Sequence, residues 1–96
     1  MTEPQIKLNG YLDVPAERWD SVLAALNIHI DLTRAEDGCI DFDVTPSQDI
    51  AHRLLVSEHF IDQASFDAHQ SRTQASDWAR ASAGIARHYE ITVVPT

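Results

Sequence analysis

Polar and apolar residues alternate along four stretches of the chain, at about residues 5–14, 39–44, 52–61 and 88–93. A period of two is typical of a strand with one face buried, so each stretch predicts a β-strand. Between the second and third of them, the run at 45–49 contains a proline and several short polar residues. That composition predicts a loop.

A helix is predicted between the first two strands. Pro15 favours the first turn of a helix, and the chain reaches a turn at Asp37-Gly38. Between these points, apolar residues recur at the spacing of one helical face, which carries Trp19, Val22, Leu23, Leu26 and Ile30.

Two shorter helices are predicted between the third and fourth strands. Asp62 is placed to cap a helix over residues 63–70, because its side chain can accept hydrogen bonds from the first turn. Thr73 is a second cap candidate and would open a helix that contains Trp78. We expect a break near residues 71–73, since an unbroken helix would turn Trp78 away from the earlier apolar face.

The element order is therefore β-α-β-β-α-β over one domain, residues 1–96. This order predicts an α+β fold of the ferredoxin-like type, an antiparallel sheet with helices packed on one face. Tyr11, Leu55 and Ile61 have the opposite parity and would lie on the uncovered face. A second copy of the chain would cover them in a homodimer; alternatively, this face is solvated with a few isolated apolar residues.

Composition narrows the possible partners. Fifteen acidic and seven basic residues give a net charge of −8, which opposes binding to nucleic acid. The chain has neither a long apolar run nor the features of a secretory signal, so we expect a cytoplasmic protein that makes no membrane contact. Cys39 is the single cysteine, which rules out an intramolecular disulfide and a zinc site built on several cysteines.

Histidine spacing gives no support to a metal site. The chain has five histidines, and none forms an i, i+4 pair with another on a helix. His52 and His59 share a strand but have opposite parity, so they project to different faces. No bound metal is expected.

Two motifs resemble those of the antibiotic biosynthesis monooxygenase family, which includes quinol monooxygenases. The first is Glu36-Asp37-Gly38-Cys39-Ile40, leading into the second strand. The second joins the third strand to the following helix and reads Glu58-His59-Phe60-Ile61-Asp62-Gln63-Ala64-Ser65-Phe66-Asp67-Ala68-His69. Membership implies a ferredoxin-like monomer and a homodimer whose two sheets face each other, the dimeric α/β barrel.

The resemblance implies a monooxygenase that oxidises a hydroxylated aromatic, such as a quinol or polyphenol, with molecular oxygen and no cofactor. Such chemistry requires a base, hydrogen-bond donors for the anion and exclusion of water. Two alternatives remain open on the same fold. One is a non-catalytic small-molecule-binding or stress-response module, and the other is oxygen-independent, isomerase-type chemistry.

His69 and Glu58 are the candidate catalytic residues. His69 closes the second motif and could take a substrate proton near neutral pH, or it could only orient its helix. Glu58 shares parity with apolar neighbours on its strand, so burial should raise its pKa unless a partner offsets this. It could pair with His69 or Arg87, or it could anchor helix to sheet without touching a ligand.

The candidate substrate-binding residues are mostly aromatic. Each could form a wall for an aromatic substrate or pack in the core. His29, near the end of the first helix, would border the cavity. Asn9 resembles an asparagine that heme-degrading relatives use, although its parity is opposite to that of the core residues unless a bulge at Gly10 intervenes. The full set is Trp78, Asn9, Phe60, Phe66 and His29.

The chain departs from its relatives at two places. Gln74 stands where many relatives carry a second histidine, and an amide cannot shuttle a proton. Trp78 or Ala79 stands where heme-degrading relatives place the histidine that binds heme iron. Heme degradation is therefore not expected.

Overall fold

The computed structural model describes residues 3–95 and consists of one sheet and one helical layer. Along the chain the elements are β1 (Gln5–Asp13), η1 (Ala16–Arg18), α1 (Trp19–Arg34), β2 (Cys39–Pro46), β3 (Arg53–Phe60), α2 (Gln63–Gln74), α3 (Asp77–Ala81) and β4 (Arg87–Val94).

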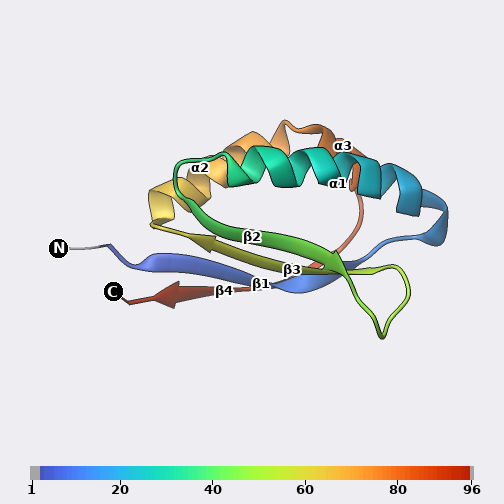
Figure 1. The fold of residues 1–96 in the computed structure, drawn as a ribbon, viewed down its shortest axis with the longest axis horizontal. Helices are drawn as coiled ribbons and strands as arrows, with labels where there is room; N and C mark the ends of the chain where they lie inside the picture. Colours follow the sequence, from blue (N-terminus) through green and yellow to red (C-terminus); the bar gives the residue numbers. More distant parts are fainter. Residues whose placement is uncertain (1–2, 96) are drawn as a thin grey trace.

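The four strands form one antiparallel sheet in the order β2-β3-β1-β4. All the helices lie on one face of this sheet, and the opposite face is uncovered (Figure 1). The ferredoxin-like α+β fold expected from the element order is confirmed.

The core lies between the sheet and the helices. Strand alternation places every second side chain on this inner face, and Leu8 on β1 stands opposite Glu58 on β3. Phe60 and Leu54 are fully buried there. β1, β2 and β3 thus deliver buried apolar side chains to the core, and β3 also delivers a carboxylate. From β4 only Tyr89 packs against the core, partly buried.

The buried face of α1 differs from the one predicted. Val22, Leu26, His29 and Thr33 are buried, at spacings of four, three and four residues. Trp19, Leu23 and Ile30 are only partly buried and pack at the margin of the core. The prediction considered apolar residues alone, whereas polar side chains occupy the last two buried positions: His29 stacks on Trp78, and Thr33 is hydrogen-bonded to Arg72 and to the His29 carbonyl.

The helix break after β3 also lies elsewhere than predicted. The Asp62 cap is confirmed, since its Oδ1 accepts a hydrogen bond of 2.8 Å from the Ser65 amide. However, α2 continues through Thr73 to Gln74, and Ser76 caps α3 instead. Nothing at residues 71–73 prevents helical backbone, so the helix runs on for one more turn.

The loop between β2 and β3 is shorter than predicted. Thr45 and Pro46 belong to β2 and stand opposite Leu55 and Leu54. A proline is tolerated there because β2 is an edge strand and Pro46 is its last residue.

Gly38 explains the glycine of the first motif. Its carbonyl accepts a hydrogen bond of 2.9 Å from the Ile61 amide, which draws the start of β2 against the end of β3. A Cβ atom at Gly38 would overlap the side chain of Ser65 in the first turn of α2. The position therefore requires a residue without a side chain.

Candidate functional site

Two adjacent hollows lie among the helices and the sheet. The inner cavity, between sheet and helices, has a volume of about 80 Å³ and is lined by His29, Phe42, Glu58, His69, Thr73 and Tyr89, among others. The outer groove, of about 370 Å³, lies between α1 and the α2–α3 segment. His29 and Trp78 line both hollows, so their side chains form the boundary between them.

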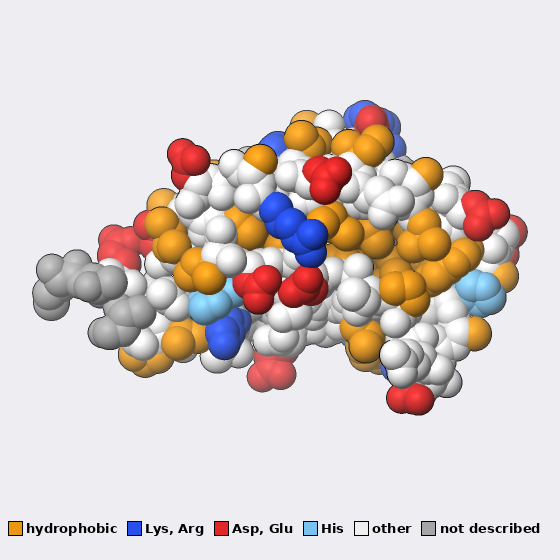
Figure 2. All heavy atoms as spheres, viewed as in Figure 1, with side chains coloured by type: hydrophobic (Ala, Val, Ile, Leu, Met, Phe, Trp, Pro, Cys, Tyr) orange, Lys and Arg blue, Asp and Glu red, His pale blue; other side chains and the backbone are white. Residues whose placement is uncertain are grey.

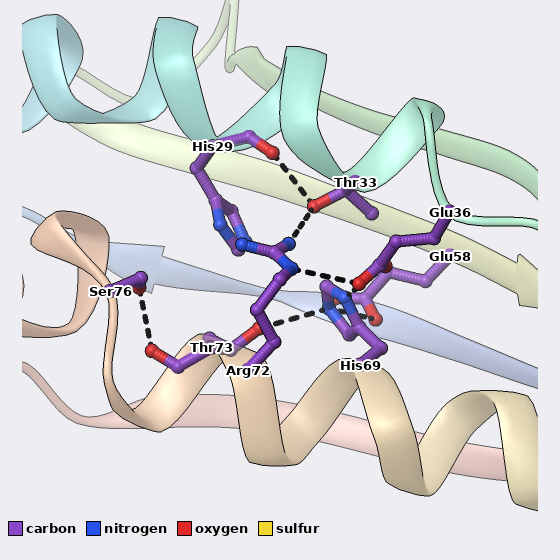
Figure 3. A network of polar contacts seen from close by, with 8 residues as sticks. All are labelled: His29, Thr33, Glu36, Glu58, His69, Arg72, Thr73 and Ser76. Atoms are coloured by element: carbon purple, nitrogen blue, oxygen red, sulfur yellow. Dashed lines mark hydrogen bonds and ion pairs between the residues drawn. The ribbon is translucent and has the colours of Figure 1, made fainter.

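His69 is the best-positioned base in the inner cavity. It projects from α2, is 2% exposed, and its Nδ1 lies 2.8 Å from Glu36 Oε1 (Figure 3). The Glu36 carboxylate can only accept this hydrogen bond, so Nδ1 carries the proton. In the neutral ring, Nε2 then holds the free lone pair. Its neighbours are Thr73 Oγ1 at 3.4 Å and Glu58 Oε1 at 3.7 Å.

A chain of hydrogen bonds fixes the partner of His69. Arg72 Nε donates to Glu36 Oε2 at 2.8 Å, and Arg72 Nη2 donates to Thr33 Oγ1 at 2.9 Å. The Thr33 hydroxyl in turn donates to the His29 carbonyl at 2.7 Å. We call the contacts of Arg72 with Glu36 and Thr33 the Arg72 clamp. It joins α2 to the end of α1 and holds the Glu36 carboxylate against His69.

Glu58 is a buried carboxyl group, and one of its oxygens lacks a hydrogen bond. It projects from β3 between Leu8 and Phe42, is 7% exposed, and its Oε1 has no hydrogen-bond partner. Burial, together with the negative charge of Glu36, raises the pKa of Glu58 to about 7. The group therefore exchanges a proton near neutral pH.

Neither partner predicted for Glu58 forms a hydrogen bond with it. His69 lies near but beyond hydrogen-bond distance, at 3.7 Å. The Arg87 guanidinium is directed to the end of α3, where it donates to the carbonyls of Ser82 and Ile85 at 2.9 and 2.7 Å. The Arg87 guanidinium thus donates to backbone carbonyls near the end of this short helix instead of to the Glu58 carboxylate.

His29 is a second neutral imidazole at the cavity. Its ring stacks on Trp78, with centroids 5.5 Å apart and planes at 11°, and its Nδ1 has no hydrogen-bond partner. Burial lowers the pKa of His29 to about 4. Burial also lowers the pKa of His69 and outweighs the opposing effect of Glu36. Both rings are uncharged at pH 7.

A phenol completes the polar lining. Tyr89, on β4, lines the inner cavity, and burial raises the pKa of its hydroxyl to about 12. The hydroxyl keeps its proton at any physiological pH, so it can serve as a hydrogen-bond donor.

Four of the predicted site residues meet at the inner cavity, namely His69, Glu58, His29 and Trp78. Phe60 lies beside them, with its ring centroid 4.9 Å from that of His69. Phe66 packs on the far side of Phe60, at 5.7 Å, and belongs to the core.

Asn9 lies away from the cavity. It is exposed on the uncovered face of the sheet, opposite Ser57 and Glu90, and the pairing of β1 continues through Gly10 without a bulge. The parity of Asn9 is therefore unchanged along the strand. Asn9, predicted to contact a substrate, is therefore not among the residues that line the inner cavity.

Sequence reasoning missed the Tyr89 hydroxyl and three residues of the polar network, Glu36, Arg72 and Thr33. Glu36 opens the first motif, which was the available signal, but its partner lies 33 residues further on. Arg72 belongs to neither motif, and it is partly buried with its ion pair to Glu36 inside the site.

Residues 3–95 contain no group of three or more histidine, cysteine or acidic side chains arranged to hold a metal ion. Within the same part of the chain, no helix has the length and apolarity that crossing a membrane requires. On the face shown in Figure 2, acidic side chains lie at several separate places rather than at one point.

The family model for antibiotic biosynthesis monooxygenases matches residues 5–81, most of the 96-residue chain. The chain belongs to the antibiotic biosynthesis monooxygenase family. The matched region includes both motifs, the Arg72 clamp and Trp78, while β4 with Tyr89 lies beyond it.

Solved structures support the same fold for this family member. A protein from Shewanella oneidensis is 26% identical with a TM-score of 0.74, over 97% of this chain and 95% of its own. A protein from Nitrosomonas europaea, named for the same family, has a TM-score of 0.78 at 16% identity, over 100% of this chain and 92% of its own. A third protein, from Deinococcus radiodurans, is also named for this family. It has a TM-score of 0.73 at 23% identity, over 95% of this chain and 91% of its own. No curated protein matches the chain significantly.

Proposed function

We propose that this family member is a cytoplasmic, cofactor-independent monooxygenase that oxidises a hydroxylated aromatic substrate with molecular oxygen. One observation carries the proposal. A neutral, buried His69 donates from Nδ1 to Glu36, so the lone pair of Nε2 is available in a cavity walled by aromatic rings. This arrangement suits the removal of a proton from a phenol or its keto tautomer.

In this mechanism the substrate hydroxyl lies against His69 Nε2 and gives up its proton there. The Glu36 carboxylate then stabilises the imidazolium, and the Arg72 clamp keeps the carboxylate in place. The substrate anion donates its electrons to oxygen. One oxygen atom enters at a ring carbon that bears one hydrogen, and this carbon becomes a carbonyl, so that the product is a quinone. The other oxygen atom leaves as water with that hydrogen and with the proton that the hydroxyl gave to His69.

Two further groups would assist this reaction. Protonated Glu58 can pass its proton to the departing oxygen and regain one from the His69 imidazolium, since its pKa of about 7 leaves it partly protonated at neutral pH. The Tyr89 hydroxyl can donate to the developing oxyanion. Phe42, Phe60 and Trp78 limit access of water to the reacting atoms.

One observation also favours oxygen-independent isomerase chemistry. His69 Nε2 and Glu58 Oε1 lie 3.7 Å apart, and the first is a base while the second can be an acid at neutral pH. Such a pair can remove a proton from one substrate atom and return it to a neighbouring atom. That reaction would consume no oxygen.

Oxygen uptake by metal-free protein separates these possibilities. We expect uptake in proportion to enzyme concentration with at least one member of a panel of quinols and polycyclic phenols, after autoxidation is subtracted. With ¹⁸O₂, one labelled atom should appear in the product. Isomerised substrate without uptake would favour the isomerase, and binding without any conversion would overturn both reactions.

We also propose that two copies of the chain pair through the uncovered sheet face. Leu55 is 45% exposed there, and Tyr11 beside it carries the Arg53 guanidinium 3.7 Å from its ring centroid. Burial of this face would remove apolar and aromatic surface from water. Sedimentation velocity should give about twice the 10.7 kDa chain mass at micromolar concentration, and Leu55→Glu should give single chains. A single-chain mass for the unmodified protein would contradict the pairing.

A further inference from the structure

Among the side chains of residues 3–95, two buried nitrogen or oxygen atoms have no hydrogen-bond partner, and both belong to residues that line the inner cavity. They are His29 Nδ1 and Glu58 Oε1, on side chains that are 4% and 7% exposed. His69 Nε2, at the same cavity, has one long hydrogen bond, of 3.4 Å, with Thr73 Oγ1. Buried polar groups are nearly always paired in folded proteins, so unpaired atoms gathered in one cavity indicate a polar ligand.

The spacing of these atoms restricts that ligand. Glu58 Oε1 and His69 Nε2 are 3.7 Å apart, and each can reach a ligand atom at ordinary hydrogen-bond length. Both atoms can act as acceptors, and a single ligand hydroxyl can donate its one proton to only one of them. Two donors that lie close together give each acceptor a hydrogen bond of its own. Oxygens on adjacent ring carbons are separated by about one hydrogen-bond length, ~2.7 Å. Oxygens in para positions lie across the ring from each other and cannot reach both partners.

We propose that the inner cavity recognises an aromatic edge bearing two oxygens on adjacent carbons, a catechol or an ortho-hydroxy ketone. One hydroxyl donates to His69 Nε2, and the second oxygen bonds to Glu58 Oε1. His29 Nδ1 lies within the same cavity and can bond to a further polar substituent or a bridging water. The inference rests on the proposed function and specifies the substrate class of that site.

The sizes of the two hollows describe the rest of the ligand. A cavity of about 80 Å³ holds the oxygenated edge of a ring but not a whole fused system. The outer groove, about 370 Å³, adjoins it through His29 and Trp78 and is lined by Ile28, Leu32 and Ala75. This volume is within the range of small-molecule sites. The class therefore includes fused aromatics whose apolar portion lies in the groove.

The test compares ligands that differ only in the placement of two hydroxyls. Anaerobic isothermal titration calorimetry would measure binding of 2,3-, 2,6- and 2,7-dihydroxynaphthalene to the unmodified protein. We expect the 2,3 isomer to bind about tenfold more tightly than the others, because it alone can engage both partners. Glu58→Leu should reduce the preference to less than about twofold. Asn9→Ala, on the opposite face of the sheet, should retain it.

Equal affinity for the three isomers would overturn the inference, as would a preference that survives in Glu58→Leu. The isomer comparison needs no variant, so it stands even if Glu58→Leu fails to fold. Because oxygen is absent, the result is independent of turnover. Selective binding of the 2,3 isomer without oxygen uptake under air would overturn the monooxygenase proposal while upholding the recognition of adjacent oxygens.

Discussion

Replacing His69 with glutamine is expected to lower the kcat for oxygen uptake by a factor of about 10² to 10⁴, the usual contribution of a general base. Glutamine can still donate a hydrogen bond toward Glu36, but it has no lone pair of suitable basicity for a substrate proton. An oxygen electrode at saturating substrate measures the change. The KM should change less than kcat, because the cavity walls remain.

The pH profile provides a second measure of the same role. His69 must be neutral to act as a base, and burial lowers its pKa. Activity should therefore persist below the ordinary imidazole value of 6.5 before it falls with acid. His52→Gln, the same change at an exposed position outside the cavity, is the matched control and should retain full activity. If His69→Gln keeps most of its activity but loses thermal stability, His69 has a structural role instead.

Glu58→Gln should raise the free energy of unfolding by up to roughly 3 kcal/mol at pH 8 and by under about 1 kcal/mol at pH 5. The pKa of Glu58 rises from 4.5 in the unfolded chain to about 7 in the folded protein. Between these values the folded state holds a proton that the unfolded state has lost, so stability falls as pH rises. Above pH 7 the full penalty of a buried charge remains, and glutamine removes it.

Urea unfolding at the two pH values measures this difference. His29 also contributes a pH dependence, because burial lowers its pKa to about 4, but that contribution is present in both proteins and cancels in the comparison. Glu17→Gln, an exposed acidic position, is the matched control and should change stability by less than about 0.5 kcal/mol at either pH. Equal stability of the unmodified protein and Glu58→Gln at pH 8 would show that Glu58 is not a destabilising buried carboxylate.

Much of the fold follows from local pattern in the sequence. Alternation along the strands and the cap at Asp62 depend on neighbouring residues, and the structure confirms them. The position of the helix break depends on which of several possible N-cap residues begins the next helix. In the structure this residue is Ser76 and not Thr73. The rotation of α1 could not be predicted from apolar periodicity, because His29 and Thr33 are buried by virtue of distant partners.

The site was predictable as far as motifs and strand parity reach. Parity placed Glu58 in the apolar layer, and the second motif directed attention to His69. The Glu36 partner of His69 could not be predicted from local sequence, because two segments far apart along the chain meet there. Asn9 shows the converse: a likeness to relatives suggested a role, whereas its strand parity had already placed it on the other face.

The Arg72 clamp limits the shape of any ligand in the outer groove. Its hydrogen bonds to Glu36 and Thr33 hold α2 against the end of α1. Arg18 holds the start of α1 against the end of α3, because its guanidinium donates to the carbonyls of Ala81 and Ala83 at 2.6 and 3.0 Å. The groove is thus attached at both ends, so a bulky ligand has to fit between these two attachments, and the geometry of the acid–base pair is insulated from the size of the ligand.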